Sequence, residues 1–307
     1  MNQIVKIICL SIIAILSTPT AALAIKDGES AAGHPRIVAL YFQTSPSWPS
    51  PVQSCTGFLY SPRIVFTAAH CVHDGTRMRE MVALRPDQMR VGVPGARSGP
   101  LAKKVRVEKI YAKPGYRFLD TSSGSSYTND FAAIVLEKPL RKVSPAKLAS
   151  SKLIEELTLS GTKIATGGYG QKSAEDAIVN PSMRSIFPSK AAFNLIPTEM
   201  GINSVRERMA MWNRSYYQSE GVSFMRYEPG TAHPCNGDSG SGFFLDGKRT
   251  PTYLGVTWAA VHPLCESGNL GSEERFKPPS GYVVAFRGIY MDLDVVNQAQ
   301  DYINSDQ

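Results

Sequence analysis

The sequence predicts an all-β protein that ends in an α-helix. Short runs rich in β-branched and aromatic residues recur along the chain, bounded by Gly, Pro, Ser or Asp: Ile37–Phe42, Cys55–Tyr60, Ile64–Thr67, Phe131–Leu136, Thr252–Trp258 and Gly281–Phe286. Helical periodicity is scarce, and its clearest instance runs from Asp294 to Ile303 at the end of the chain. Hydrophobic residues make up 43% and charged residues 19% of the 307 residues, as in a globular protein with one large domain or two small ones.

The chain begins with the features of an export signal. Lys6 gives a charged start, Ile7–Leu16 is an apolar run, and Ala22-Leu23-Ala24 is a small-x-small cleavage site. A membrane anchor is the alternative, but a spanning helix needs about 20 apolar residues, and this run is shorter. We therefore expect residues 1–24 to be removed. The protein is expected to be secreted, either extracellular or periplasmic, with no membrane contact after signal cleavage.

Four cysteines follow this segment, namely Cys55, Cys71, Cys235 and Cys265. An even number behind an export signal predicts two disulfides. A zinc site is the alternative, but the chain has no CxxC pair, and its neighbouring His and Cys residues have poor spacing for zinc. We expect no metal and no cofactor.

The net charge and the loop-forming segments of the chain indicate less about function. The formal net charge is +7, and the densest basic patch, Lys103–Arg106 followed by Lys109, alternates with apolar residues as in a strand with one solvated face. We therefore expect no nucleic-acid binding. A divide is expected near Arg141–Ser151 and a loop at Ser122–Tyr127, whereas the mixed composition of residues 171–222 supports no assignment.

Three segments carry candidate catalytic residues, and each alone has an ordinary explanation. His70 follows a strand, where a single histidine is usually structural. Asp130 stands before the apolar run, where an acid is commonly a cap or turn residue. Ser239 lies among glycines, and Gly, Asp and Ser also form plain turns.

Together the three residues predict nucleophilic catalysis. A nucleophilic serine needs an open approach and backbone N–H groups aimed at the developing oxyanion. The glycines around Ser239 allow the tight turn that this requires. A histidine can take the proton of that serine, and an aspartate can orient the imidazole and stabilise its protonated form.

The order of these motifs resembles that of the trypsin-like (chymotrypsin-fold) serine protease family, whose triad is a standard template. Thr67-Ala68-Ala69-His70-Cys71 resembles the histidine motif of the family, Asn129–Leu136 its aspartate motif and Gly237-Asp238-Ser239-Gly240 its serine motif. Lesser matches are the mature start (Ile25–Leu40), a turn of the second barrel (Gly168-Tyr169-Gly170), the strand that pairs with substrate (Val256-Thr257-Trp258) and a pocket wall (Gly288-Ile289-Tyr290). The likeness covers about residues 25–170 and 223–305.

The resemblance implies two antiparallel six-stranded Greek-key β-barrels with a C-terminal α-helix. The peptidase domain would span 25–307, with the first barrel at about 25–145, the second at about 146–292 and the helix at about 293–305. The implied function is a secreted serine endopeptidase that cleaves polypeptide substrates through an acyl-enzyme intermediate. Protein inhibitors of proteases are a further class of implied partner.

The resemblance also assigns roles within the site. Ser239 would attack the peptide carbonyl, His70 would carry the proton, and Asp130 would hold the tautomer. The N–H groups of Gly237 and Ser239 would form the oxyanion hole. The implied disulfides are Cys55–Cys71 and Cys235–Cys265.

Two further features are implied by position. Signal cleavage would expose Ile25, whose ammonium would pair with Asp238 without a separate pro-segment. His233, six residues before the nucleophile, stands where an aspartate selects Arg or Lys in trypsin-like enzymes, so cleavage after Arg or Lys should be poor. His233 would receive an uncharged side chain, hold an acidic one when protonated, or only buttress the loop. The remaining implied pocket residues are Thr257, Trp258, Ala259 and Gly288.

The chain also departs from the family pattern. Ile25-Lys26-Asp27-Gly28 replaces the usual Ile-Val-Gly-Gly, and Gly240-Ser241-Gly242 replaces the usual Gly-Gly-Pro. The acidic calcium loop is missing, since Met89–Arg106 is basic, so no metal is expected. The alternative function is a catalytically silent homologue that acts as a binding or regulatory module. Such relatives usually lose a triad residue, and all three are present here.

Overall fold

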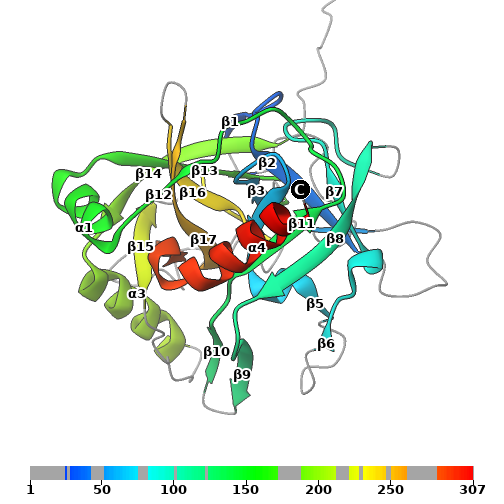
Figure 1. Ribbon diagram of the computed structural model, residues 1–307. Helices are drawn as coiled ribbons and strands as arrows, with labels where there is room; N and C mark the ends of the chain where they lie inside the picture. The colour runs from blue at the N-terminus through cyan, green and yellow to red at the C-terminus, as the bar shows by residue number, and fades with distance from the viewer. Residues whose placement is uncertain are drawn as a thin grey trace, which may run out of the picture.

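The computed structural model describes residues 25, 28–42, 52–74, 82–99, 102–121, 124–171, 188–211, 221–227, 231–246, 250–260 and 282–306. Two closed barrels lie side by side, and the C-terminal helix crosses in front of them (Figure 1). The predicted signal segment, residues 1–24, lies outside the described residues. No helix in the described part of the chain is long and apolar enough to cross a membrane.

The first barrel is closed by six antiparallel strands in the order β11-β4-β3-β2-β7-β8, with β8 pairing back to β11. Its strands are short, and β2, β4 and β11 are almost entirely buried, as the apolar runs of the sequence predict. They are β2 (Ile37–Phe42), β3 (Val52–Leu59), β4 (Ile64–Thr67), β7 (Met89–Gly92), β8 (Lys104–Ala112) and β11 (Ala132–Leu136).

The second barrel has the order β14-β13-β16-β17-β18-β15 and closes through the pairing of β15 with β14. Two short strands join it from outside: β1 (Glu29–Ser30) pairs with β14, and β12 (Lys147–Leu148) pairs with β17. Two closed six-stranded antiparallel barrels confirm the predicted fold class. The strands of this barrel are β13 (Lys163–Gly168), β14 (Ser189–Ile196), β15 (Val222–Tyr227), β16 (Gly242–Leu245), β17 (Thr252–Ala260) and β18 (Tyr282–Gly288).

The predicted terminal helix is present as α4 (Leu293–Ser305), which packs one apolar stripe on the first barrel. The described residues contain two further helices that were not predicted. The first, α1 (Ser151–Ser160), starts at Ser150, whose hydroxyl accepts a hydrogen bond from the Leu153 N–H, and ends at Gly161. The second, α3 (Thr198–Met211), lies in the stretch that the sequence left unassigned, where Met, Asn and charged residues obscure any apolar periodicity.

Short elements complete the description. The expected loop at Ser122–Tyr127 is wrong in part, because residues 124–128 form strand β10 and pair with β9 (Arg117–Thr121). The Ser/Gly-rich composition does not indicate this strand, because the strand is stabilised by pairing with β9, the segment just before it. The others are the strands β5 (His73–Asp74) and β6 (Val82–Ala83) and the 3₁₀ turns η1 (Ala69–Val72), η2 (Pro86–Gln88) and η5 (Ile289–Met291).

Aromatic side chains join the two barrels in one core. The Tyr253 ring of β17 lies 4.8 Å from that of Phe58 and 5.2 Å from that of Phe66, both from the first barrel. Each buried ring removes roughly 150–250 Å² of surface from water, so this contact is a large part of the attraction between the barrels. It fixes β4, which leads to His70, against the barrel that carries Ser239.

Candidate active site

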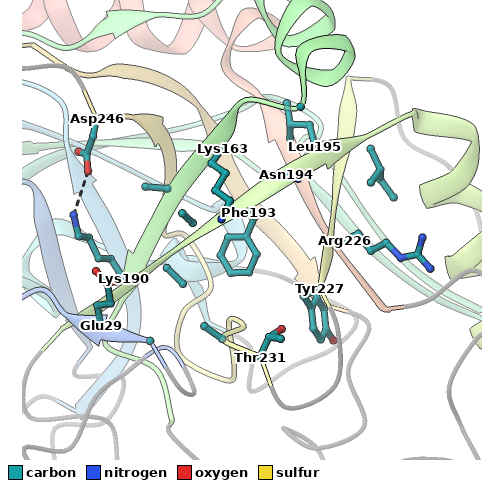
Figure 2. Close-up of a pocket in the computed structure, with 17 residues that line it drawn as sticks. Glu29, Lys163, Lys190, Phe193, Asn194, Leu195, Arg226, Tyr227, Thr231 and Asp246 are labelled. Carbon is teal, nitrogen blue, oxygen red and sulfur yellow. Dashed lines mark hydrogen bonds and ion pairs between the residues drawn. The ribbon is translucent and has the colours of Figure 1, made fainter.

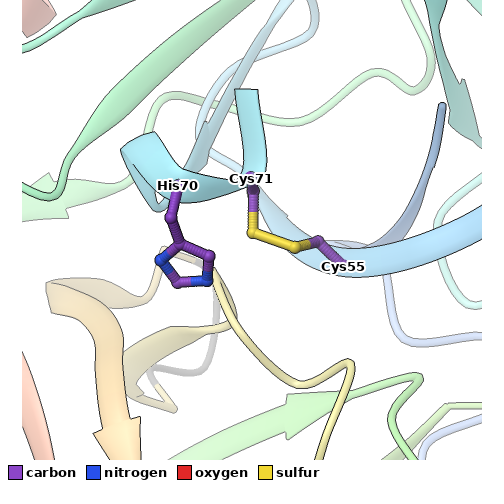
Figure 3. A group of neighbouring side chains, drawn as sticks. All are labelled: Cys55, His70 and Cys71. Carbon is purple, nitrogen blue, oxygen red and sulfur yellow. A yellow bond between two sulfur atoms is a disulfide. The ribbon is translucent and has the colours of Figure 1, made fainter. Parts of the chain in front are cut away.

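His70 lies in η1, directly after β4, and the disulfide beside it fixes its backbone. Cys55 and Cys71 are bonded with a Cα–Cα distance of 6.1 Å, which confirms this predicted pair (Figure 3). Closing a loop of 16 residues contributes roughly 3 kcal/mol in the chain-entropy account. These sulfurs and the His70 ring lie within 4.8 Å of one another, but disulfide sulfurs are not thiolate ligands, so the cluster is no metal site.

Asp130 binds His70 at two points. Its Oδ2 lies 2.7 Å from His70 Nδ1, and its Oδ1 accepts a 2.8 Å hydrogen bond from the His70 backbone N–H. The carboxylate is fully buried. This geometry makes Nδ1 the donor and leaves Nε2 as the basic nitrogen of the ring.

The pKa of His70 reflects two opposed effects. Burial is the largest and lowers the pKa, but the charge of Asp130 and its hydrogen bond together raise it, and the pKa of His70 ends above its usual value of 6.5. A base with a pKa near the working pH is suited to proton transfer.

The segment before Asp130 is held from both barrels. Asn129 has a left-handed backbone, with φ 55°, and its Nδ2 donates to the carbonyl oxygen of Pro114 at 2.9 Å. Its Oδ1 lies 3.5 Å from Nη2 of Arg287, at the end of β18. Arg287 is buried and forms a bidentate ion pair with Asp292, at 2.8 and 3.0 Å.

Ser239 lies in a tight loop that packs on the segment leading to His70. Its carbonyl oxygen accepts a 3.0 Å hydrogen bond from the Thr56 N–H and lies 3.5 Å from Cys71 Sγ. Gly237 and Gly240 have φ of 93° and 79°, which glycine adopts without strain. The loop of the second barrel is therefore tied to strand β3 of the first, with Ser239 half-buried beside the histidine segment.

Asp238 holds this loop in place through hydrogen bonds in the interior. It is fully buried, and its two oxygens each accept a 2.8 Å hydrogen bond, one from the Gly170 N–H and one from the Cys235 N–H. A side chain at Gly168 or Gly170 would overlap the Asp238 carboxylate, which explains the glycines of this turn. Ile25, its predicted partner, is fully buried, and its N–H donates to Ser189 Oγ.

His233, the residue predicted for the base of the substrate pocket, lies inside the second barrel's loop region as a buried side chain. His233 is fully buried, its Nδ1 lies 2.8 Å from the carbonyl oxygen of Thr231, and its ring stacks on Tyr227 with centroids 5.1 Å apart. Gly288 lies opposite Gly255 in the ladder of β17 and β18. Trp258 and Ala259 belong to β17, and their side chains lie outside the described part of the structure, as does Cys265. Cys235 is disulfide-bonded.

Three buried hydroxyls, those of Ser241, Thr257 and Thr166, lie next to the Ser239 loop; the sequence analysis named Thr257 only as a pocket residue and did not foresee this cluster. Ser241 Oγ lies 2.7 Å from Thr257 Oγ1, which donates to the Ser241 carbonyl oxygen at 3.1 Å. Thr166 Oγ1 lies 3.3 Å from Ser241 Oγ and donates to the Gly242 carbonyl oxygen at 3.0 Å. The replacement of the usual glycine by Ser241 was the one sequence signal that pointed to them.

A separate cavity lies on the outer side of the second barrel. It has a volume of about 750 Å³ and is lined mainly by β13, β14 and the end of β15, with none of the triad residues among its walls. Figure 2 shows Lys190 bonded to Asp246 at one end and Tyr227 with Thr231 toward the other. The cavity therefore reaches the residues that hold His233 without opening onto His70.

Comparison with known proteins supports the same family. The family model described as Trypsin matches residues 25–272. A "Modular serine protease" of Drosophila melanogaster is 27% identical over 210 residues, 66% of this chain and 29% of that protein, so the chain spans less than a third of its length. "Trypsin eta" of Drosophila erecta is 24% identical over 231 residues, 72% of this chain and 78% of that protein. With a family match over most of its length and two closed antiparallel barrels, this chain belongs to the trypsin family of serine proteases.

Proposed function

We propose that the protein is a secreted serine endopeptidase that uses His70, Asp130 and Ser239. The observation that carries the proposal is the pairing of His70 with buried Asp130 at 2.7 Å, beside a glycine-rich loop that presents Ser239. A paired, oriented histidine next to a serine on a tight turn is the arrangement that activates a hydroxyl nucleophile.

The proposed reaction follows from these positions. Ser239 Oγ attacks the carbonyl carbon of the peptide as its proton passes to Nε2 of His70, and the imidazolium is stabilised by Asp130. The N–H groups of Gly237 and Ser239 receive the oxyanion. His70 then gives the proton to the leaving amine, and water releases the acyl group by the same steps in reverse.

The proposal includes the maturation of the protein. Signal cleavage after Ala24 would place the Ile25 ammonium near Asp238, and Cys235 would pair with Cys265. Non-reducing peptide mapping tests the second disulfide: a free thiol at Cys265, or another partner for Cys235, would contradict it.

A fluorophosphonate probe tests the proposed function directly, because an activated serine attacks its phosphorus, displaces fluoride and becomes phosphonylated, whereas an ordinary serine does not react. The secreted protein should be labelled at Ser239 and should cleave a denatured protein substrate, and Ser239→Ala should lose both properties. Ser305→Ala, at an exposed hydroxyl on α4, is the matched control and should behave as the wild type. A folded wild type that is neither labelled nor cleaves peptides would favour the silent binding module instead.

The proposed substrates are polypeptides that lack Arg or Lys at the residue before the cleaved bond. The support is the absence of a carboxylate at position 233 and the packing of His233 against Tyr227 and Thr231. A peptide-library profile at pH 5.5 and pH 8 separates the options: acidic preference at the lower pH indicates a protonated His233 that contacts substrate. Dominant cleavage after Arg or Lys would show that His233 does not lie at the pocket base.

A further inference from the structure

Ser189 holds both polar backbone atoms of Ile25. This serine is the first residue of β14 and is fully buried, as is Ile25. Its hydroxyl accepts a hydrogen bond from the Ile25 N–H and donates one to the Ile25 carbonyl oxygen at 3.2 Å. The Gly28 N–H donates to the same carbonyl oxygen at 2.9 Å. Burying the Ser189 hydroxyl costs desolvation free energy, which is recovered only when its hydrogen bonds form. Both of these bonds are made to residue 25, which lies 164 positions away in the sequence, so this hydroxyl is placed to bind residue 25.

The strand register places this hydroxyl on the side of the sheet that carries Asp238. Ser189 lies directly opposite Gly168 in the antiparallel ladder of β13 and β14. Residues that are directly opposite point to the same face of a sheet. A side chain at Gly168 would overlap Oδ1 of Asp238, so Asp238 lies against the sheet next to the residue that Ser189 faces. The Ile25 N–H reaches the same part of the sheet through its bond to the Ser189 hydroxyl.

We propose that Ser189 is a positioning residue for the N-terminus of the active enzyme, because its hydroxyl accepts a hydrogen bond from the Ile25 ammonium and holds it at Asp238. The inference rests on the proposed function and adds a residue to it. An ammonium has three N–H donors, so one can remain on Ser189 Oγ while another meets the carboxylate. The Asp238 backbone leads directly into the nucleophile Ser239, so a displaced ammonium disturbs the oxyanion hole.

Among the described residues near Ser189, the other charged groups face elsewhere or are exposed, which leaves Asp238 as the counter-ion of the proposal. Lys190 follows Ser189 and points to the opposite face, where its Nζ lies 3.2 Å from Asp246. Glu29 lies opposite Lys190 on β1 and is exposed. Burial lowers the pKa of nearby His34 to about 4, so its ring is neutral at the pH values of the test. Lys26 and Asp27 lie outside the described residues.

The loss of kcat/KM at high pH tests the proposal. A free α-amino group loses its proton at about pH 8, and docking at Asp238 retains the proton to higher pH. Ser189→Ala removes one acceptor of a charged donor, which should weaken the hold on the ammonium about tenfold. The midpoint of the alkaline loss of kcat/KM should therefore fall by about one pH unit, whereas below pH 7 the kcat/KM of the variant should stay close to that of the wild type at the same pH. A purely structural defect would lower activity equally at every pH.

A second readout follows the amine itself. Reductive methylation at pH 7, read by mass spectrometry of the N-terminal peptide, should modify Ile25 about tenfold faster in Ser189→Ala than in the wild type. Ser30→Ala is the matched control, because Ser30 pairs with Ser189 across the strands but is exposed. Ser189→Cys preserves the side-chain shape with a weak hydrogen-bonding group, and should shift the limb in the same direction if the alanine variant does not fold.

The outcomes separate this inference from the proposed function. A wild type that does not react with the fluorophosphonate probe refutes the enzyme itself. A reactive wild type whose Ser189 variants keep the alkaline midpoint and the methylation rate of Ser30→Ala overturns the role of Ser189. An active protein whose N-terminus is not Ile25 overturns it as well.

Discussion

Gly240 packs against Thr67 so closely that no side chain fits between them. A Cβ at Gly240 would overlap Thr67 Oγ1 and come within 2.6 Å of the Thr56 carbonyl oxygen, and Gly240 has φ 79°. The residue after Ser239 thus packs against the strand end that precedes His70. The relative position of Ser239 and His70 depends on this contact.

Gly240→Ala should therefore lower kcat/KM by about 100-fold or more, because a displacement near 1 Å at the reacting groups has an effect of that size. Gly33→Ala is the matched control: it has nearly the same φ, 80°, but open space around the added methyl. That variant should lose only about 1–2 kcal/mol of stability and keep its activity. Similar kcat/KM losses in both variants would mean that backbone strain, and not the contact with Thr67, is responsible.

The pH dependence of activity should follow His70. Its pKa is raised, so kcat/KM should fall as pH decreases through a value above 6.5, where the general base becomes protonated. The same shift stabilises the folded protein below pH 6.5, and this contribution is lost as pH rises through the folded-state pKa.

Asp130→Asn removes both effects that raise the pKa of His70 and leaves burial, which lowers it. The acid limb should move below pH 6.5, and kcat should fall roughly 10⁴-fold because the ring loses its tautomer and its counter-charge. Asp246→Asn, at an exposed acid of the second barrel, should leave the limb in place. If Asp130→Asn is active and its kcat/KM falls at the same low pH as in the wild type, a group other than His70 causes that fall.

The site residues that the sequence proposes are those that local motifs mark. His70, Asp130 and Ser239 each lie at the end of a strand or in a glycine turn, and such positions are visible in a linear sequence. Ser189, Thr166 and Arg287 are not, because their roles come from register and packing between distant strands. The helix α3 was missed for a related reason, since its contacts with β15 and β18 and not its own periodicity hold it in place.

The hydroxyl pair Ser241 and Thr257 should show a measurable coupling. Thr257→Val removes the 2.7 Å bond to the buried Ser241 hydroxyl, at a cost of about 1–3 kcal/mol, and Ser241→Ala removes the same bond from Thr257, whose hydroxyl keeps the Ser241 carbonyl oxygen as its acceptor. The double variant should be less destabilised than the sum of the two, with a coupling of about 1 kcal/mol.

Urea unfolding of the four proteins measures this coupling. The exposed hydroxyl pair Ser160 and Thr162, at 2.8 Å, offers the matched cycle and should show almost none. Equal coupling in the two cycles would show that burial does not strengthen the Ser241–Thr257 bond.

Tyr253→Phe should stabilise the protein. The Tyr253 hydroxyl is fully buried and, among the described residues, has no hydrogen-bond partner, and burial with the nearby charge of Asp292 raises its pKa well above 10.0. Removing an unsatisfied hydroxyl recovers its desolvation cost, about 1–3 kcal/mol, and the ring keeps its contacts with Phe58 and Phe66. Tyr60→Phe is the matched comparison and should destabilise by about 1 kcal/mol, because the Tyr60 hydroxyl accepts a 2.8 Å bond from Gln300 Nε2. Thermal unfolding of both variants decides the matter, since an equal loss in Tyr253→Phe would mean that a buried water bonds this hydroxyl.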